Sequence, residues 1–220
     1  MPSFWQYFLS FLYPPRCPGC HAAVSRHGEW CRYCRDEVWQ PRQLGGSHRG
    51  KLAGCYACTD YRGGVRSALL RYKFGRKHLD PLAFQNLLRD FPWPDAFPDD
   101  ALCVPIPLSR ERYAERGFNQ VAEIFAPLAR ERGWQWSKDL VKIRHTPAQS
   151  TLSRTDRHTN IKNSFRWEGA PLTSCTVILV DDIYTTGATL EEAARILHRA
   201  GAAQIIGWVI APVPRKLSVG

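Results

Sequence analysis

The chain has 220 residues, of which 44% are hydrophobic and 23% are charged, a balance typical of globular rather than disordered or fibrous proteins. No stretch approaches the roughly 20 consecutive apolar residues of a membrane-spanning helix. The formal net charge of +10 favours an anionic partner such as nucleic acid, a phosphorylated metabolite or a membrane surface, and the alternative is a protein that is simply basic.

Residues 4–12, near the N-terminus, are apolar and rich in aromatic side chains. No basic residue precedes them and no small-residue cleavage site follows, which is not the pattern of a secretory signal peptide. We expect a short helix docked on the protein's own core, and the alternative is a contact of the aromatic rings with a membrane interface. The sequence therefore predicts a cytoplasmic protein, with peripheral contact at the inner face of the membrane as the alternative.

Cysteines dominate the segment from residue 1 to residue 60. Six of the eight in the chain form three C-x-x-C pairs, Cys17/Cys20, Cys31/Cys34 and Cys55/Cys58. Without a secretion signal, such pairs indicate metal ligands rather than disulfides, and free or redox-active thiols are the alternative. The remaining two, Cys103 and Cys175, lie beside apolar runs and are expected in the core.

The spacing of the first two pairs is typical of a structural zinc site. One tetrahedral zinc ion with no open position could be held by four thiolates, those of Cys17, Cys20, Cys31 and Cys34. A rival pairing combines the second pair with Cys55 and Cys58, because the gap between those pairs also suits zinc. The surrounding segment is too irregular to build a core unaided, so we predict a metal-stabilised module over residues 1–60.

From residue 61 onward, apolar residues recur at helical and strand spacings. The predicted elements, in chain order, are helices over 65–72 and 79–89, a strand over 101–105, a helix over 119–132, a strand over 177–180, a helix over 190–197 and a strand over 204–211. Residues 144–164 are polar, basic and poorly periodic, which is typical of a functional loop. Strands that alternate with helices predict a parallel α/β sheet flanked by helices over residues 61–220.

The stretch TVILVDDIYTTGATL, residues 176–190, joins a buried strand to a helix. Its two carboxylates, Asp181 and Asp182, are expected at the carboxyl end of the strand, where ligands bind in open α/β sheets. The following turn is rich in hydroxyl groups, and Gly187 permits an unusual backbone angle there. The backbone N–H groups of such a turn and helix start favour a phosphate, whereas carboxylates suit sugar hydroxyls or a magnesium ion. Together they predict a site for a phosphorylated sugar.

Two other interpretations fit parts of this stretch. The acids could act as caps near the start of a helix in an ordinary strand–turn–helix, although capping does not require the whole pattern. A receiver-type acidic pocket also uses paired acids, but those acids normally lie on an early strand, whereas Asp181 and Asp182 lie near the C-terminus.

The order of hydrophobic strand, Asp-Asp and Thr-Thr-Gly-x-Thr closely resembles the 5-phosphoribosyl-1-pyrophosphate (PRPP) motif of type I phosphoribosyltransferases. The resemblance implies that Asp181 and Asp182 hold the ribose hydroxyls, and that Mg²⁺ accompanies PRPP. The resemblance also implies that the turn after the acids completes the PRPP site and that residues 185–189 bind the 5′-phosphate. The residues of this turn are Tyr184, Thr185, Thr186, Gly187, Ala188 and Thr189.

The phosphoribosyltransferase family also places a pyrophosphate-binding loop after an earlier strand and a flexible loop farther along. Arginine suits pyrophosphate because its guanidinium donates two parallel hydrogen bonds, although a solvated basic turn is the alternative. The matching candidates, which could equally hold DNA phosphates, are Arg110, Arg112 and Arg116 in the first segment and Arg144 and Arg157 in the second.

Longer segments resemble the ComF family, which includes the GntX-like proteins. They are residues 72–74 (YKF), 116–120 (RGFNQ) and 146–149 (TPAQ), and with the cysteine module the resemblance covers nearly the whole chain. It implies a zinc module before a type I phosphoribosyltransferase domain, in a protein of natural competence or DNA utilisation that handles incoming single-stranded DNA. ComF-like proteins often carry a double zinc ribbon, but here no C-x-x-C pair lies between Cys34 and Cys55, so the second ribbon is expected to be degenerate.

Two functions follow. In the first, an accessory protein binds PRPP or a similar ligand together with single-stranded DNA, whose phosphates meet the basic segments around 62–78 and 144–166 while aromatic rings stack on bases. A competence helicase or the uptake machinery would be its protein partner. In the second, an active phosphoribosyltransferase transfers ribose-5-phosphate from PRPP to an acceptor through an oxocarbenium-like state. No residue in the sequence identifies that acceptor, so no catalytic residue is assigned.

Overall fold

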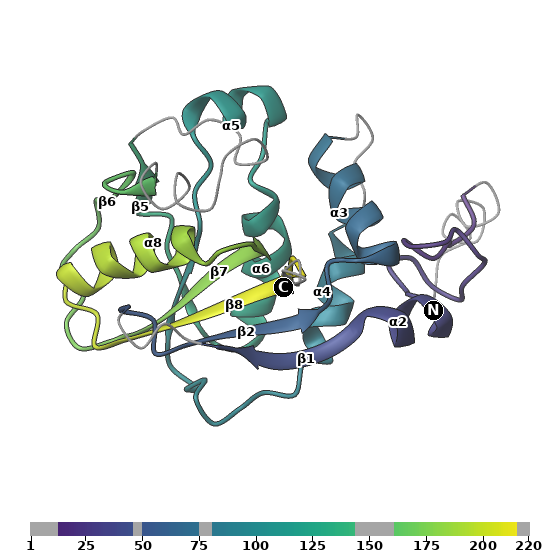
Figure 1. The fold of residues 1–220 in the computed structure, drawn as a ribbon, viewed down its shortest axis with the longest axis horizontal. Helices are drawn as coiled ribbons and strands as arrows, with labels where there is room; N and C mark the ends of the chain where they lie inside the picture. The colour runs from purple at the N-terminus through teal and green to yellow at the C-terminus, as the bar shows by residue number, and fades with distance from the viewer. Residues whose placement is uncertain (1–12, 46–49, 75–80, 144–160, 215–220) are drawn as a thin grey trace, which may run out of the picture.

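The computed structural model describes residues 13–45, 50–74, 81–143 and 161–214 (Figure 1). The expected helix at 4–12 and most of the expected loop at 144–164 lie outside these ranges. The described chain is built around a sheet of strand order β1-β2-β8-β7-β3-β4. All neighbouring strands in it are parallel except β1 and β2. A separate antiparallel pair is formed by β5 and β6.

The elements confirm the predicted α/β class. The strands are β1 (Trp39–Leu44), β2 (Gly54–Thr59), β3 (Leu102–Pro105), β4 (Gln135–Trp136), β5 (Leu140–Lys142), β6 (Phe165–Trp167), β7 (Thr176–Tyr184) and β8 (Gln204–Pro212). The helices are α2 (Arg32–Val38), α3 (Gly63–Phe74), α4 (Leu82–Arg89), α5 (Arg110–Arg116), α6 (Gln120–Glu131) and α8 (Ala188–Arg199). Within the described ranges, none of these helices is long and apolar enough to cross a membrane.

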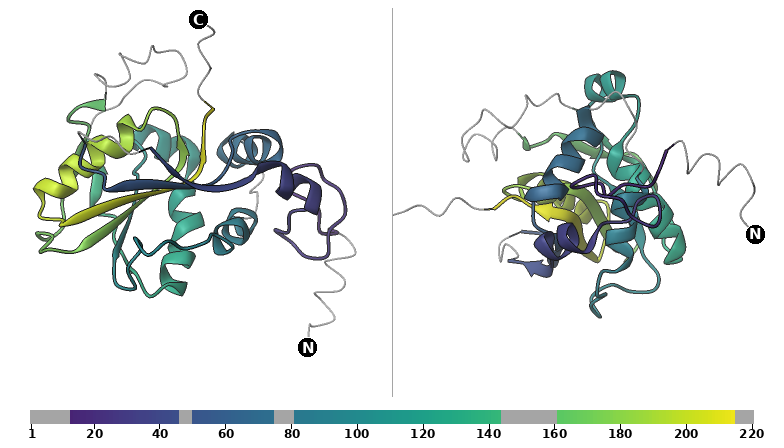
Figure 2. Two further views of the ribbon diagram at one scale, coloured as in Figure 1. Left: turned by 60° about the horizontal axis from the view of Figure 1, so that its bottom comes forward. Right: turned by 90° about the vertical axis from the view of Figure 1, so that its right-hand side faces the viewer.

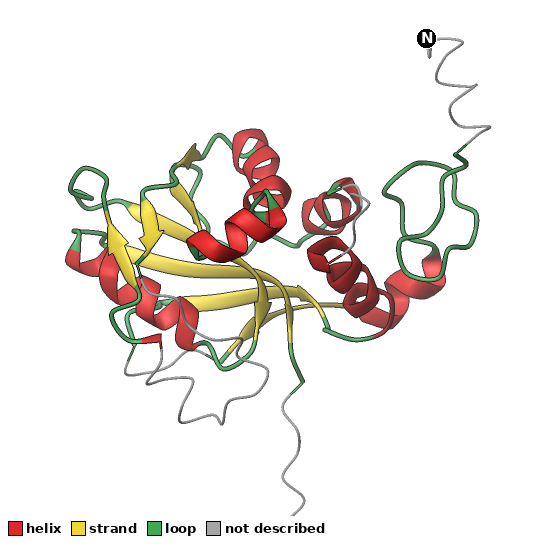
Figure 3. Cartoon of the chain, turned by 90° about the horizontal axis from the view of Figure 1, so that it is seen from above, coloured by secondary structure: helices red, strands yellow, loops and turns green. Residues whose placement is uncertain are grey.

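Helices cover both faces of the sheet (Figure 3). On one face, α3, α4 and α6 pack against strand side chains such as Ile178 and Trp208. On the other face, Leu190 of α8 packs with Val177 and Leu179. This division follows from the pleat, because successive side chains of a strand point to opposite faces of its sheet. A central strand that is covered on both sides reads as an uninterrupted apolar run, as residues 177–180 do.

β7 is longer than predicted, and its length positions the acidic pair. The expected strand end at Val180 was wrong, because the strand continues to Tyr184 and includes both Asp181 and Asp182. Pairing with β8 supports this extension, whereas β3 on the other side ends at Pro105. The two acids therefore extend past the end of β3 and have a paired strand on one side only.

β1 and β2 both belong to the main sheet. β2 is buried throughout and pairs in parallel with β8, and β1 adds an antiparallel edge. The expected division at residue 60 assigned both strands to the cysteine module, whereas the structure places them in the main sheet and, among the described residues before β1, leaves 13–38 outside it. The segment GCYACT carries only a weak strand signal, because four of its six residues are glycine, alanine and cysteine, which are not among the β-branched and aromatic residues that mark strands.

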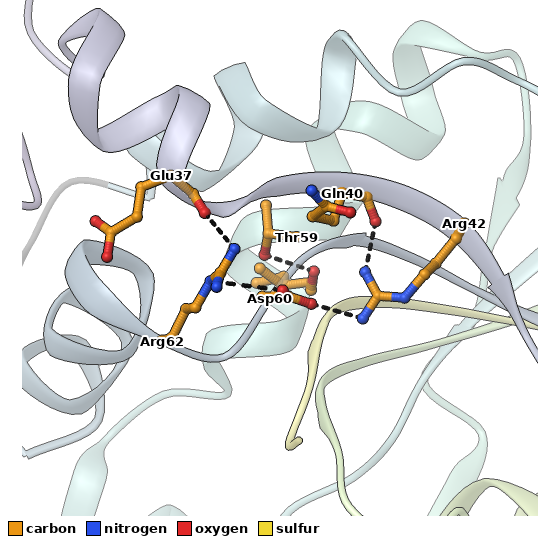
Figure 4. A network of polar contacts seen from close by, with 7 residues as sticks. Glu37, Gln40, Arg42, Thr59, Asp60 and Arg62 are labelled. Atoms are coloured by element: carbon orange, nitrogen blue, oxygen red, sulfur yellow. Dashed lines mark hydrogen bonds and ion pairs between the residues drawn. The ribbon is translucent and has the colours of Figure 1, made fainter. Parts of the chain in front are cut away.

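A polar network fastens α2 and β1 to the start of α3 (Figure 4). The Arg42 guanidinium donates to the Asp60 carboxylate at 2.6 Å and to the Gln40 carbonyl at 2.7 Å. Arg62 pairs with the other Asp60 oxygen at 3.5 Å and donates to the Glu37 carbonyl at 2.7 Å. Because Asp60 binds both arginines, the connection from the edge of the sheet into α3 is fixed.

Candidate ligand site and cysteine centre

The loop between β7 and α8 has the geometry of an anion-binding turn. β7 ends at Tyr184, and α8 begins at Ala188 after a bend. Gly187 adopts a left-handed conformation (φ 82°) at the helix N-cap, and a Cβ atom there would collide with the Tyr184 hydroxyl. The Thr186 hydroxyl accepts a hydrogen bond from the Ala188 N–H at 3.4 Å. Hydroxyl groups and the positive end of the α8 dipole thus converge where a phosphate would be stabilised.

Asp182 is an internal anchor of the site. Only 4% of the residue is exposed, and its Oδ2 atom accepts hydrogen bonds from Lys73 Nζ and from Gln120 Nε2, each at 2.8 Å. Lys73 lies in the last turn of α3 and Gln120 in the first turn of α6, so one carboxylate joins β7 to two helices. Arg116 in turn donates to the Gln120 side-chain oxygen. Buried charges of this kind are stable only when they are paired in this way.

Asp181 is the more accessible of the two acids, as expected for neighbours whose side chains leave a strand on opposite faces. Its Oδ1 atom accepts a hydrogen bond from the Asp182 backbone N–H at 2.8 Å. Burial and the Asp182 carboxylate raise the pKa of Asp181 to about 8, while Lys73 and Lys142 act in the opposite direction. The neighbouring carboxylate therefore disfavours ionisation of free Asp181, whereas a ligand whose hydroxyl groups donate hydrogen bonds to the ionised carboxylate would favour that form.

The described part of the predicted pyrophosphate segment forms α5, which carries Arg110, Arg112 and Arg116. The Ser109 hydroxyl caps this helix by accepting from the Arg112 N–H at 3.4 Å. Arg116 is the arginine that the structure connects to the acidic pair, because it contacts Gln120 and the Asp182 charge acts on its pKa against the lowering by burial. The two remaining candidates, Arg144 and Arg157, lie outside the described residues.

A cavity of about 850 Å³ lies between α5, the start of α6 and β5. Its lining combines apolar and aromatic groups such as Tyr113 with basic groups such as Arg110 and Lys142. Burial and the Arg112 charge lower the pKa of Lys142 to about 8, and the Asp181 charge opposes them, so this lysine connects the cavity to the acidic pair. The volume falls in the range of small-molecule sites.

The first two cysteine pairs converge in a second centre. The Sγ atoms of this cluster all lie within 4.8 Å of one another, and they belong to Cys17, Cys20, Cys31 and Cys34. The Cys20 and Cys31 sulfurs are 3.6 Å apart, close to the edge of about 3.8 Å of a tetrahedron with Zn–S bonds of about 2.3 Å. Burial opposes the thiolate of Cys17, but hydrogen bonds from the Cys20 and Cys31 backbone N–H groups outweigh it and lower the Cys17 pKa to about 7. The donor set therefore fits one structural zinc ion.

Cys55 and Cys58 lie in β2 and are not part of this cluster. The Cys58 sulfur accepts a hydrogen bond from the Trp208 indole N–H at 3.3 Å. Burial raises the pKa of Cys55 to about 12 and also raises that of Cys58. Both residues therefore behave as neutral thiols packed in the sheet.

We expect one zinc ion per chain, dependent on the clustered sulfurs alone. Cys17→Ser removes one of four ligands and should release most of the metal, because three thiolates leave the tetrahedral site open. Cys55→Ser changes a sulfur in the sheet and should leave the zinc content unchanged. Elemental analysis of the two purified variants measures this, and equal zinc loss in both would contradict the assignment to the cluster.

Sequence reasoning missed two residues of the candidate site, Lys73 and Gln120. Both lie in segments that carried the family resemblance, residues 72–74 and 116–120, but Lys73 was expected only as part of the basic segment for DNA, and Gln120 received no role. A usable signal was present at Lys73, because it directly follows an apolar helical face and a partly buried lysine needs a carboxylate partner. The sequence contained no corresponding signal for Gln120, whose contact depends on how α6 packs on β7.

Comparisons with known proteins match a family domain to each of the two parts of the chain. Residues 8–44 match the double zinc ribbon domain, and residues 139–218 match the phosphoribosyl transferase domain. The DNA utilization protein YhgH of Salmonella typhi is 40% identical over 208 residues, which are 88% of this chain and 88% of that protein.

Two competence proteins named ComFC are also similar. The Streptococcus pneumoniae protein is 31% identical over 190 residues, which are 86% of this chain and 77% of that protein. The Bacillus subtilis protein is 33% identical over 190 residues, which are 85% of this chain and 73% of that protein. With relatives aligned over most of its length, the chain belongs to the ComF family of the DNA utilization protein YhgH and the competence protein ComFC.

Proposed function

We propose that this protein binds PRPP or a similar phosphoribosyl ligand, together with single-stranded DNA, in natural competence or DNA utilisation. The observation that carries the proposal is the β7–α8 loop, in which Asp181 precedes a threonine-rich bend and a helix N-terminus. The phosphoribosyl transferase match and the names of the relatives support it. We place the protein on the cytoplasmic side, where a competence helicase or the uptake machinery would be its partner.

In the proposed complex, each part of PRPP has its own set of contacts. The ribose hydroxyls meet Asp181, which Asp182 supports from within the protein. The 5′-phosphate lies over the bend at 185–187 and the first turn of α8, where threonine hydroxyls and N–H groups can donate. The pyrophosphate, with Mg²⁺, extends toward α5, where arginines suit its charge.

Asp181→Asn should weaken PRPP binding about tenfold to hundredfold, because one charge-assisted interaction contributes roughly 1.5–3 kcal/mol. Asp181→Asn/Asp182→Asn should abolish it. Asp95→Asn, an exposed acid in a loop, is the matched control and should bind as the wild type does. Isothermal titration with PRPP and Mg²⁺ measures all three, and no heat from the wild type, or equal heat from the double variant, would rule out this role.

For DNA, the structure narrows the set of available basic groups. In the described part of segment 62–78, three cations already have internal partners: Arg62 with Asp60, Arg71 with Pro18 and Lys73 with Asp182. Arg66 on α3 and Arg110 on α5 are exposed. Arg66 and Arg110 are therefore the described residues that we substitute to test DNA binding.

Affinity for single-stranded DNA should fall steeply with salt. If about four phosphates are neutralised, the loss between about 50 and 200 mM salt should be roughly fiftyfold, and each contact removed should reduce the logarithmic slope by about 0.7. Arg66→Gln/Arg110→Gln should therefore flatten the salt dependence, whereas Asp95→Asn should not. Fluorescence anisotropy with a labelled oligonucleotide measures the slope, and absence of binding at low salt would refute this part of the proposal.

The cavity beside α5 favours an active transferase as the second candidate. In that reaction, an acceptor nucleophile bonds to the ribose anomeric carbon while the bond to pyrophosphate breaks, and the leaving oxygen takes the electron pair. The arginines on α5 would neutralise the pyrophosphate, and the acceptor would occupy the cavity. Pyrophosphate release from PRPP that depends on an added acceptor would support this candidate, and release that is unaffected by Asp181→Asn would exclude it.

A further inference from the structure

The last turn of α3 lies between the cysteine centre and the ligand site. Figure 2 shows α3 beside the segment before α2 at one end of the sheet. Two side chains of this turn, Arg71 and Lys73, extend to different centres. Their contacts connect a metal site to an acidic pair far away in sequence.

Arg71 holds the loop that presents the first two sulfurs. Its guanidinium donates to the carbonyl of Pro18, which lies between Cys17 and Cys20 in the sequence. The residue is partly buried, and among the described residues its Nε atom has no hydrogen-bond partner. A zinc ion with four thiolates carries a net negative charge, so metal binding would strengthen the attraction between this loop and Arg71.

The beginning of α3 packs directly on the same centre. A Cβ atom at Gly64 would lie 2.7 Å from the Gly19 Cα and 3.7 Å from the Cys34 sulfur. No residue larger than glycine fits there unless the backbone moves. The helix therefore contacts the cysteine loops both at its beginning and in its last turn.

The other side chain of the turn is part of the ligand site. Lys73 Nζ lies 2.8 Å from Asp182 Oδ2, and the lysine side chain is 16% exposed. Between the two cations, the buried Tyr72 donates its hydroxyl to Glu123 at 2.6 Å, which fixes the turn against α6. An ion pair of this length and burial is sensitive to small displacements of either partner.

We propose that the last turn of α3 couples the two centres. Zinc at the four cysteines fixes the turn through Arg71, the turn fixes Asp182 through Lys73, and the affinity of the adjacent Asp181 site for its ligand depends on zinc. Arg71 and Lys73 are positioning residues in this scheme. The inference rests on the proposed function, because it takes the acidic pair as a ligand site. Coupling between two binding sites is reciprocal, so the ligand must tighten zinc binding by the same factor.

The test uses the full-length protein, with zinc bound or removed by a chelator, and PRPP with Mg²⁺ as the probe. Zinc removal should weaken PRPP affinity about tenfold in isothermal titration, within the usual range of such couplings. PRPP should raise the apparent zinc affinity about tenfold in competition with a chromogenic chelator. If the wild-type PRPP affinity is the same with and without zinc, the proposal is wrong.

The variant Arg71→Met tests whether the coupling between zinc and PRPP binding depends on Arg71. It retains all four sulfurs and Lys73 but removes the link, so zinc removal should then change PRPP affinity less than about twofold. Arg66→Met removes a positive charge from an exposed position of α3. In this variant, zinc removal should weaken PRPP affinity by the same factor as in the wild type. If zinc removal weakens PRPP affinity as much in Arg71→Met as in the wild type, Arg71 does not carry the coupling.

Amide hydrogen exchange separates the coupling from the proposed function and from unfolding. Zinc removal should speed exchange in residues 70–74 while β7 and β8 stay protected, whether or not PRPP binds. A zinc-loaded wild type that binds no PRPP would refute the proposed function, whereas unchanged exchange in residues 70–74 would refute the coupling. Loss of protection in β7 and β8 would attribute the effect to global unfolding and also refute the coupling.

Discussion

Trp208→Ala should lower the free energy of unfolding by about 3–5 kcal/mol. The side chain is fully buried, and its ring centroid lies 4.7 Å from that of Trp93 and 5.0 Å from that of Phe125. Its indole N–H donates to the Cys58 sulfur at 3.3 Å. Alanine would leave a large void on the sheet face that α6 covers, and rigid rings around the void cannot collapse into it.

The free energy of unfolding is measured by denaturant titration, and two further variants serve as comparisons for Trp208→Ala. Trp208→Phe retains most of the volume and should cost about 1–2 kcal/mol. Trp167→Ala removes a partly buried tryptophan of β6, whose N–H donates to the Ala170 carbonyl, and should cost about 1 kcal/mol. Equal losses from the two tryptophan-to-alanine variants would show that the aromatic cluster around Trp208 contributes no special stability.

Lys73→Met should cost about 3 kcal/mol, because it leaves the Asp182 carboxylate buried without its cation. Only 6% of the Asp182 side chain is exposed, so water cannot replace the lost partner well. Gln120 still donates one hydrogen bond to it, which keeps the expected cost at the lower end of the range for broken buried pairs.

The double variant Lys73→Met/Asp182→Asn distinguishes a lost charge pair from lost packing. With no carboxylate left behind, it should recover most of the stability that Lys73→Met loses. Arg66→Met, on the exposed face of the same helix, should change stability by less than about 0.5 kcal/mol. A double variant that is less stable than Lys73→Met would contradict this account of the pair.

The predicted elements that the structure confirms have strong local signals. The periodic helices α4, α6 and α8 and the apolar strands β7 and β8 were all expected within a few residues of their observed bounds. β2 was missed because its parallel partner β8 is remote in sequence, and neither β1 nor β2 is rich in the β-branched residues that mark a strand alone. The extension of β7 was missed for a related reason, since the partner that continues it is β8.

In the candidate site, too, residues with a local sequence signal were predicted and residues that depend on remote contacts were not. The acidic pair and the threonine bend were recognisable because they are contiguous in sequence. The supporting contacts were not recognisable, because Lys73 and Gln120 reach Asp182 across sequence separations of 109 and 62 residues. Tertiary contacts of this kind determine which of the two adjacent acids is buried. The local sequence pattern does not distinguish Asp181 from Asp182 in this respect.

The place of β2 in the sheet has a consequence for how the chain folds. β2 pairs with β8, and the contact between Cys58 and Trp208 spans 150 residues. During synthesis, the four clustered cysteines can be assembled early because they are close in sequence. β2, in contrast, must wait for β8 before it gains its parallel neighbour, and contacts of such long range slow folding. Until then the apolar residues of β2 have no partner strand on that side, so β8, the last strand of the described residues, completes the pairing of a strand that was synthesised much earlier.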